Sequence, residues 1–539
     1  MTKFLFFFCL LFLFCSCGSI KGLKDETSHF NEQFNSARVK FSNYDQLNRS
    51  PYGNWQLRIE GNDFELGYKK GKITQSLFQK QEDIFFRKMA EYIPNPKRQR
   101  FLVRFLKWYH RDILKEIPLS YRQEIFGLSL HASDHWKHLG TKYERSLLLH
   151  GAHDIGHAMQ DLMLVGCSSV ALWDEHTADG QLLIARNFDF YINEEFAKNK
   201  IIEFIKPSEG YKYAAVSWPG MIGVVSGMNE KGLTITLNAG RSNIPLSGKT
   251  PISIVARTVL QHAKNIEEAI NIAKKFKVFV AESILIGSSE DNRAVNIEMS
   301  PKNFDVYTVE NDILLCTNHF QSATYSNDKR NQAQISSSHS QYRLDKLKES
   351  IKTNRRYEPK DLVPILRDVS GMSSRNIGYG NEKSLNQLIA HHAVIFKPDE
   401  LIMWVSNNPY QLGAFEAYNL AEIFKSNESI QSVKSLEIPA DPFLKTDTFA
   451  NFLVFRKQLP LIEKAIKQKK LLSADELAQF EDSNPNFWLT HKEIADYYFS
   501  QNNWQKAVRY YENALTKEIS SEKAKEYIEK RLLKAKKKR

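Results

Sequence analysis

The chain has 539 residues, 42% hydrophobic and 25% charged, with a formal net charge of +12. This balance is typical of globular proteins and excludes an intrinsically disordered chain, and the length is enough for two or more domains. The basic C-terminus, residues 534–539, is of a kind that can contact anionic lipid or nucleic acid. No nucleic-acid-binding motif accompanies it, so we interpret it as a solvated helix end and expect no nucleic acid partner.

The first residues have the pattern of an export signal. Lys3 precedes an apolar run over residues 4–14, which is too short to span a bilayer, and Ser16 directly precedes Cys17. A small residue before a cysteine resembles the bacterial lipoprotein signal, in which that cysteine is lipidated. We therefore expect lipidation of Cys17 and a membrane-anchored protein in the periplasm or on the cell surface. Phe14 lies three residues before Cys17, where leucine is more usual in lipoprotein signals. A plain secretory signal is therefore the alternative.

Apolar periodicity and turn signals divide the rest of the chain. Apolar residues recur at helical spacing ahead of residue 166, and short apolar runs punctuated by Gly and Pro follow. Strands, a helical pair and strands again predict an α+β fold with two sheets packed face to face between helical layers. In chain order we expect a signal peptide over 1–17, a linker over 18–49, a helical segment over 50–166, a main domain over 167–425, a linker over 426–448 and a helical region over 449–539.

The C-terminal helical region contains one short repeat-like unit. Residues 496–515 resemble a tetratricopeptide repeat. A stable array needs about three copies, and only one is clear. We therefore predict a helical appendage that docks on the main domain and that is a possible site for a protein partner.

Residues 166 and 167 are the centre of the functional hypothesis. Gly166 permits strained backbone geometry, and Cys167 is followed by small hydroxyl residues and an apolar strand. If the thiol cut the chain before itself, Cys167 would carry both a nucleophilic sulfur and an α-amine base with a pKa of about 8. The alternative is a small buried cysteine at the start of a strand.

The cysteine count bears on this choice. Removal of the signal takes Cys9 and Cys15, and lipidation uses Cys17, so the folded body keeps only Cys167 and Cys316. No disulfide framework is therefore expected. A free thiol outside the cytoplasm is exposed to oxidation, and catalysis by Cys167 would explain why it is retained, whereas burial suffices for Cys316.

Five short motifs follow one another in order along the chain. They are Cys167 and the segments 185–190, 227–238, 316–319 and 340–343, and a glycine pattern at 61–71 precedes them. This series resembles the cysteine branch of the N-terminal-nucleophile hydrolases, over about residues 61–420. It is most similar to the acyl-coenzyme A:6-aminopenicillanic acid acyltransferase family and more distantly similar to the choloylglycine hydrolases. The resemblance implies a four-layer αββα sandwich and a precursor that is cut between Gly166 and Cys167.

The resemblance also implies a role for each matching residue. Cys167 is the nucleophile, Arg186 stabilises its thiolate, and Asp189 bonds the new α-amine. Asn238 and Asn318 line the oxyanion hole, and Arg343 is a supporting arginine. Without the resemblance, Arg186 and Asp189 are compatible with a strand-end ion pair, and the two asparagines with turn residues.

Four histidines lie in pairs that could suggest other sites. His153 and His157 have the spacing of a metal-binding pair, but no third ligand accompanies them, so we expect no metal. His391 and His392 on one strand should point to opposite faces, which suits packing. No phosphate-binding glycine loop occurs, and no cofactor is expected.

These observations give a ranked set of functions. The first is an exported, self-processing amidase or acyltransferase that acts on a small N-acyl amide through a thioester on Cys167. Hydrolysis is favoured over transfer, because acyl-coenzyme A is an intracellular donor. The second is a non-catalytic lipoprotein scaffold that binds a partner through its helical C-terminus. The third is lipid or phospholipid hydrolysis by the same nucleophile.

Overall fold

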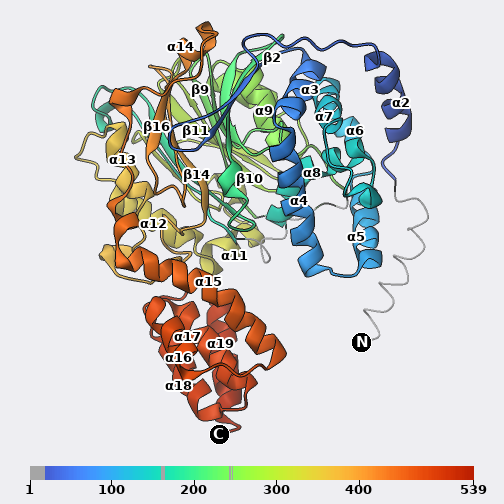
Figure 1. Ribbon diagram of the computed structural model, residues 1–539. Helices are drawn as coiled ribbons and strands as arrows, with labels where there is room; N and C mark the ends of the chain where they lie inside the picture. The colour runs from blue at the N-terminus through green and yellow to red at the C-terminus, as the bar shows by residue number, and fades with distance from the viewer. Residues whose placement is uncertain (1–18, 159–163, 242–244, 246) are drawn as a thin grey trace.

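A computed structural model of the chain describes residues 19–158, 164–241, 245 and 247–539 (Figure 1). The predicted signal peptide and Cys17 lie outside these residues, so export and lipidation stay predictions. None of the helices in the described part of the chain combines the length and the apolar character that a membrane crossing needs.

The larger sheet has nine strands in the described residues, in the order β1-β2-β6-β7-β8-β9-β10-β11-β12. Neighbouring strands are antiparallel except β2 and β6, which are parallel. Strand β2 from the N-terminal segment is therefore an internal strand of this sheet. The bounds are β1 (Gln46–Arg49), β2 (Trp55–Gly61), β6 (Ile201–Pro207), β7 (Tyr213–Ser217), β8 (Ser226–Asn229), β9 (Leu233–Ala239), β10 (Glu282–Ser288), β11 (Arg293–Met299) and β12 (Phe304–Tyr307).

The smaller sheet has the order β13-β4-β5-β14-β15-β16, with the short strand β3 paired to β5. Strands β3 and β4 pair with successive parts of β5, and the Gly166–Cys167 bond lies in the break between them. The fold thus holds this bond from both sides. The bounds are β3 (Leu164–Val165), β4 (Ser168–Leu172), β5 (Leu183–Tyr191), β13 (Ile313–Cys316), β14 (Ala390–Lys397), β15 (Ile402–Ser406) and β16 (Phe415–Asn419).

The two sheets lie face to face between helices, which confirms the predicted four-layer α+β fold (Figure 1). Helices α9 (Ile252–His262) and α10 (Ile266–Ala273) cover the larger sheet, whereas α12 (Ser340–Ser350) and α13 (Pro359–Leu366) cover the smaller one. Alternating strand residues supply the apolar layers, because successive side chains point to opposite faces of a sheet. Phe204 and Val216 of the larger sheet meet Val394 and Met403 of the smaller one, and all four are fully buried.

A helical layer precedes residue 166, as the apolar spacing predicts. Its members are α3 (Asp63–Ile73), α4 (Gln75–Tyr92), α5 (Pro96–Tyr109), α6 (Ile113–Glu116), α7 (Leu119–Ser129) and α8 (Lys142–Ala158). Helices α3 and α7 approach closely because both carry glycine at the contact. A Cβ on Gly67 would lie 1.8 Å from the carbonyl oxygen of Glu124.

The polar linker that we expect over residues 18–49 is instead ordered structure. Helix α2 (Leu23–Phe34) buries Leu23 and Phe30 against the helical layer, and β1 joins the larger sheet. The few apolar residues in this stretch are spaced to lie on one side of the helix, a pattern that its polar average hides.

The C-terminal helices form a separate layer below the sandwich (Figure 1). Phe452, Phe487 and Tyr511 build its core, and Leu388 and Tyr410 of the main domain complete that core. The region therefore docks on the main domain, while its identity as a tetratricopeptide unit stays a prediction. The remaining helices are α11 (Lys329–Ser337), α14 (Leu420–Lys425), α15 (Asp447–Gln468), α16 (Ala474–Ser483), α17 (Trp488–Ser500), α18 (Trp504–Leu515) and α19 (Glu522–Lys536).

Candidate active site

The Cys167 side chain is fully buried at the start of β4. The preceding peptide is intact, and the Gly166 N–H donates to the carbonyl of Asp189 on β5 at 3.3 Å. Burial raises the pKa of the Cys167 thiol more than nearby Arg186 lowers it. In the intact chain the thiol is therefore mostly protonated near neutral pH.

Arg186 and Asp189 both come from β5, on which the register places Arg186 opposite Ser169. The guanidinium of Arg186 donates to the sulfur of Cys167 at 3.6 Å and to the carbonyl of Val225 at 3.0 Å. It also donates to the Ser226 hydroxyl and to the Leu237 carbonyl. This buried cation is held beside the sulfur by several acceptors, which is the arrangement that favours a thiolate.

The carboxylate of Asp189 is fully buried, and neither of its oxygens has a hydrogen-bond partner among the described residues. Burial raises its pKa to about 7, against the opposing effect of Arg343 and Arg186. Burying a carboxylate without a hydrogen-bond partner costs free energy. The position of Asp189 is therefore suited to binding a cation.

Arg343 lies on α12 and is also fully buried. One terminal nitrogen donates to the Gly166 carbonyl at 3.2 Å, to the Ser168 hydroxyl at 2.8 Å and to the carbonyl of Cys167. The other donates to the side-chain oxygen of Asn318 at 2.6 Å. Arg343 therefore contacts the bond before Cys167 directly.

The two asparagines flank the same place from β9 and from the end of β13. The Asn238 side-chain oxygen accepts from Ser169 at 3.0 Å, and its nitrogen donates to the carbonyls of Cys316 and Thr317 at 3.3 and 3.4 Å. The Asn318 amide nitrogen donates to the Ala239 carbonyl at 2.9 Å. In the intact chain both amide groups are thus bonded to backbone carbonyls.

The structure brings all six predicted site residues together, although they are spread along the chain from residue 167 to residue 343. It also adds a residue that sequence reasoning missed. The side-chain nitrogen of Gln387 donates to the carbonyl oxygen of Gly166 at 3.1 Å, and Gln387 is 1% exposed. No local pattern singles out this glutamine, since it precedes β14 in an irregular segment.

The histidine pair on β14 differs from our expectation. A register shift between Ala390 and His392 interrupts the strand alternation, and the Nδ1 atoms of His391 and His392 lie 2.8 Å apart. His392 also bonds the Ser226 hydroxyl, which contacts Arg186. The extra residue at this bulge shifts the alternation of side chains between the two faces of the strand. Both histidine rings are therefore buried.

Cys316 makes no contact with the Cys167 sulfur among the hydrogen bonds of the described residues. Cys316 is fully buried and unoxidised, and its thiol donates to the carbonyl of Thr317 at 3.5 Å. The side chains of His153 and His157 lie outside what the structure describes. Among the described residues, no cluster of His, Cys, Asp and Glu has the make-up of a metal site.

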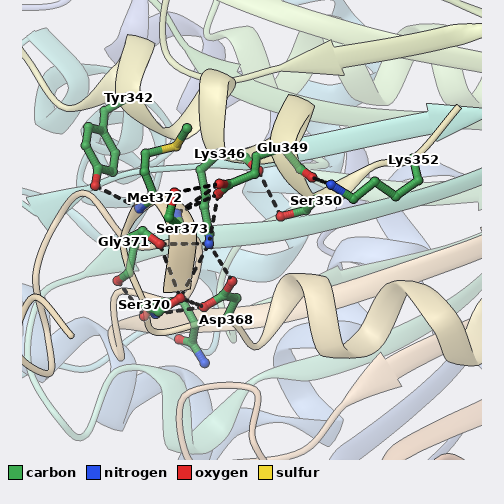
Figure 2. A network of polar contacts seen from close by, with 12 residues as sticks. Tyr342, Lys346, Glu349, Ser350, Lys352, Asp368, Ser370, Gly371, Met372 and Ser373 are labelled. Carbon is green, nitrogen blue, oxygen red and sulfur yellow. Dashed lines mark hydrogen bonds and ion pairs between the residues drawn. The ribbon is translucent and has the colours of Figure 1, made fainter. Parts of the chain in front are cut away.

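A polar network fixes the helix that carries Arg343. Figure 2 shows Lys346, which lies one turn after Arg343 on α12, between Glu349 and the loop at residues 368–373. Its ammonium group pairs with Asp368 at 3.1 Å and donates to the Gly371 carbonyl at 2.8 Å. Glu349 accepts from the Ser373 N–H at 2.9 Å. Helix α12 is thereby tied to residues 368–373.

Residues 176–408 match the model of the family described as acyl-coenzyme A:6-aminopenicillanic acid acyl-transferase. Over these residues the chain is similar to the family that the motifs indicate. The matched segment contains five of the six candidate site residues, namely Arg186, Asp189, Asn238, Asn318 and Arg343. Cys167 lies just before it.

Among curated proteins, the chain is 25% identical over 274 residues to an uncharacterized protein of Archaeoglobus fulgidus, covering 47% of this chain and 45% of that protein. It is 23% identical over 275 residues to protein dcd1B of Dictyostelium discoideum, covering 48% and 52%. The chain thus spans about half the length of these relatives.

Two solved structures are also similar to this chain. One is a Caenorhabditis elegans ortholog of N-acylethanolamine-hydrolyzing acid amidase, with 20% identity and a TM-score of 0.32, covering 43% of this chain and 93% of that one. The other is a mutant of the conjugated bile acid hydrolase from Clostridium perfringens, with 13% identity and a TM-score of 0.33, covering 49% and 95%.

Proposed function

We propose that this protein is a self-processing cysteine amidase that cleaves the acyl group from a small N-acyl amide. The observation that carries the proposal is a pair of arginines at one peptide bond: Arg186 donates to the sulfur of Cys167, and Arg343 donates to the carbonyl oxygen of the preceding residue, Gly166. The family match supports an acyl-transfer reaction at this site.

Self-cleavage begins when the Cys167 sulfur attacks the carbonyl carbon of Gly166. A carbon–sulfur bond forms, the carbonyl oxygen becomes an oxyanion, and the proton of the thiol passes to the Cys167 nitrogen. The bond from this carbon to that nitrogen then breaks as the oxyanion returns to a carbonyl. Water hydrolyses the resulting thioester, which leaves a Gly166 carboxylate, a free thiol and a new α-amine.

Asp189 supports this sequence of events. Its buried carboxylate has no hydrogen-bond partner among the described residues while the chain is intact. The protonated α-amine of Cys167 would supply a cation beside β5, where Asp189 directly precedes Phe190, the pairing partner of Val165. The carboxylate would then hold the amine as the proton carrier of the mature enzyme.

The mature residue would act on an external amide by the same chemistry. Its sulfur would attack the substrate carbonyl, and the α-amine would pass a proton to the leaving amine. Asn238 and Asn318 would face the developing oxyanion after rearrangement of their present bonds. We propose water as the second acceptor, which makes the enzyme a hydrolase with no cofactor.

The N-terminal sequence supports a location outside the cytoplasm. Residues 1–17 have the features of a lipoprotein signal, so we propose that Cys17 anchors the enzyme to a membrane. A protein partner at the C-terminal helices also stays a proposal.

The test is a denaturing gel of the expressed protein with intact mass measurement of its fragments. We expect two fragments with a new N-terminus at Cys167, and one uncut chain for Cys167→Ala. Cys316→Ala is the matched control, because it removes the other buried thiol and should leave cleavage unchanged. An intact wild-type chain whose thiol resists active-site alkylation would contradict the proposal.

A further inference from the structure

The carbonyl oxygen of Gly166 accepts two side-chain hydrogen bonds in the intact chain. Gln387 donates at 3.1 Å and Arg343 at 3.2 Å. Resting on the self-cleavage proposed above, we infer that Gln387 is a catalytic residue of that step. Together with Arg343, its amide forms the oxyanion hole in which the tetrahedral intermediate at Gly166 is stabilised.

The Gln387 hydrogen bond has the distance expected for this role. Donors in an oxyanion hole lie about 2.7–3.1 Å from the oxygen that becomes charged, and they matter most where water is excluded. Gln387 lies at 3.1 Å, within this range, and Arg343 at 3.2 Å, just beyond it. Gln387 and Arg343 are 1% and 0% exposed. Attack by the sulfur turns the Gly166 carbonyl carbon tetrahedral and places a full negative charge on the oxygen that both groups already contact. Neither donor gives up a proton, so the atom balance of the cleavage is unchanged.

The absence of a side chain at residue 166 fits the same arrangement. A Cβ placed there would lie 1.9 Å from the Gln387 side-chain nitrogen. Glycine is therefore required for this amide to reach the carbonyl oxygen. Gly166 and Gln387, which are 221 residues apart, thus depend on each other for this hydrogen bond.

The asparagines that the sequence assigns to an oxyanion hole do not supply this donor. The amide nitrogen of Asn238 is bonded to Cys316 and Thr317, and that of Asn318 to Ala239. Self-cleavage and turnover of an external amide would thus use different donors. Gln387 and Arg343 serve the first, and the asparagines serve the second.

The residues on either side of Gln387 are fixed by hydrogen bonds and by packing against the C-terminal helices. The preceding residue, Asn386, donates its N–H to the Asp368 carbonyl at 2.9 Å, and its side chain accepts from the Leu388 N–H at 3.0 Å. Leu388 is buried in the core of the C-terminal helices. The segment that presents Gln387 therefore lies between the sheet and the helical region, so its backbone has little freedom to move.

The first experiment compares two buried glutamines. Gln387→Met keeps the length of the side chain and removes the donor, whereas Gln411→Met changes a glutamine whose amide donates to the Leu366 carbonyl at 2.7 Å. Each variant is made by cell-free synthesis and sampled over time on a denaturing gel. We expect Gln387→Met to slow cleavage about 100-fold or more, the usual effect of losing one oxyanion donor, and Gln411→Met to leave the rate close to that of the wild type.

The second experiment uses the isosteric variant Gln387→Glu and the pH. A protonated glutamic acid donates a hydrogen bond, whereas its carboxylate repels the oxyanion. Between about pH 5 and about pH 8, the cleavage rate of Gln387→Glu should fall, while that of the wild type should rise with thiolate formation. A purely structural role would give both proteins the same pH dependence.

The outcomes separate the two levels of the proposal. A wild-type chain that stays intact overturns self-cleavage and the role of Gln387 with it. A wild type that cleaves while Gln387→Met cleaves equally fast, or a Gln387→Glu rate that rises with pH, overturns the role of Gln387 alone. Thermal unfolding of both methionine variants in the uncleavable Cys167→Ala background shows whether slow cleavage comes from misfolding. Slow cleavage of a Gln387→Met chain that melts well below the Gln411→Met chain counts against the inference.

Discussion

At the scale of single residues, the carboxylate of Asp189 lies in an unfavourable environment in the intact chain. Its carboxylate is fully buried and lacks a hydrogen-bond partner among the described residues, although two arginines act on it. Folding must therefore remove this carboxylate from water without full compensation. Self-cleavage would relieve that cost by placing a cationic amine nearby, which gives the reaction a local driving force.

This reasoning predicts a pH-dependent gain from Asp189→Asn in the Cys167→Ala background. Burial raises the pKa of Asp189 from 3.8 to about 7. A raised carboxyl pKa means that the folded chain binds the proton more tightly, so the stability is full below pH 3.8 and declines as pH rises to about 7. The unfolding free energy of the asparagine variant should thus exceed that of its parent by an amount that grows over this range to a few kcal/mol.

Denaturant unfolding of both proteins at several pH values measures this difference. Asp305→Asn in the same background is the control, because Asp305 is partly exposed and its pKa is lowered by hydrogen bonds. That substitution should cost stability by an amount that is already full just above pH 3.8 and stays constant as pH rises, because the pKa of Asp305 is lowered from 3.8. A constant difference between the Asp189 pair across the range would contradict the explanation.

At the scale of elements, two contacts connect the segment that leads to Gln387 with the C-terminal helices. The loop after α13 continues into residues 375–388, where the Tyr379 N–H donates to the Asn484 side chain at 3.1 Å and Asn484 donates back to the Tyr379 carbonyl at 2.8 Å. Glu518 pairs with Lys383 at 2.6 Å. The helical region therefore braces the segment that ends at Gln387.

We predict that Asn484→Ala slows self-cleavage and lowers the melting temperature. The variant leaves a backbone N–H and a carbonyl of Tyr379 without their partner, which costs about 1–3 kcal/mol per buried group. The cleavage time course and a thermal melt measure both effects. Asn451→Ala, an exposed position on α15, is the matched control and should change neither. Cleavage of Asn484→Ala at the rate of the wild type would show that the bracing does not reach Gln387.

At the scale of the whole molecule, the segment before the proposed cleavage site is built into the fold of the segment after it. Strand β2 lies between β1 and β6 and pairs with β6 along its whole length. Lys70 of α3 pairs with Glu203 of β6 at 2.8 Å, and both side chains are buried. Breaking the peptide at Gly166 therefore removes one covalent bond and none of these contacts.

We predict that the two fragments stay together after cleavage and elute as one species in native gel filtration. Lys70→Met leaves Glu203 buried without its cation and should destabilise the complex by about 3–5 kcal/mol. Lys80→Met is the matched control, since Lys80 and Glu195 join the same two fragments at 3.3 Å but are half exposed. That exposed pair is worth about 0–1 kcal/mol. Separate elution of the wild-type fragments would contradict this prediction.

The sequence by itself predicted the α+β layering and, through its resemblance to a known family, six candidate site residues that the structure brings together. Alternating and helical apolar spacing report on which face of an element is buried, and that information is local. The order of motifs around Cys167, Arg186 and Asp189 is local in the same sense. Sequence patterns alone are therefore sufficient to predict these features.

Only the tertiary structure decided which distant groups meet at the Gly166–Cys167 bond. The bulge beside His392 resets the strand alternation, and α2 finds its partners in helices that follow it far along the chain. Gln387 reaches the Gly166 carbonyl across 221 residues, from a segment without periodicity. Such contacts depend on how whole elements pack, because no short stretch of sequence records the position of its neighbours in space.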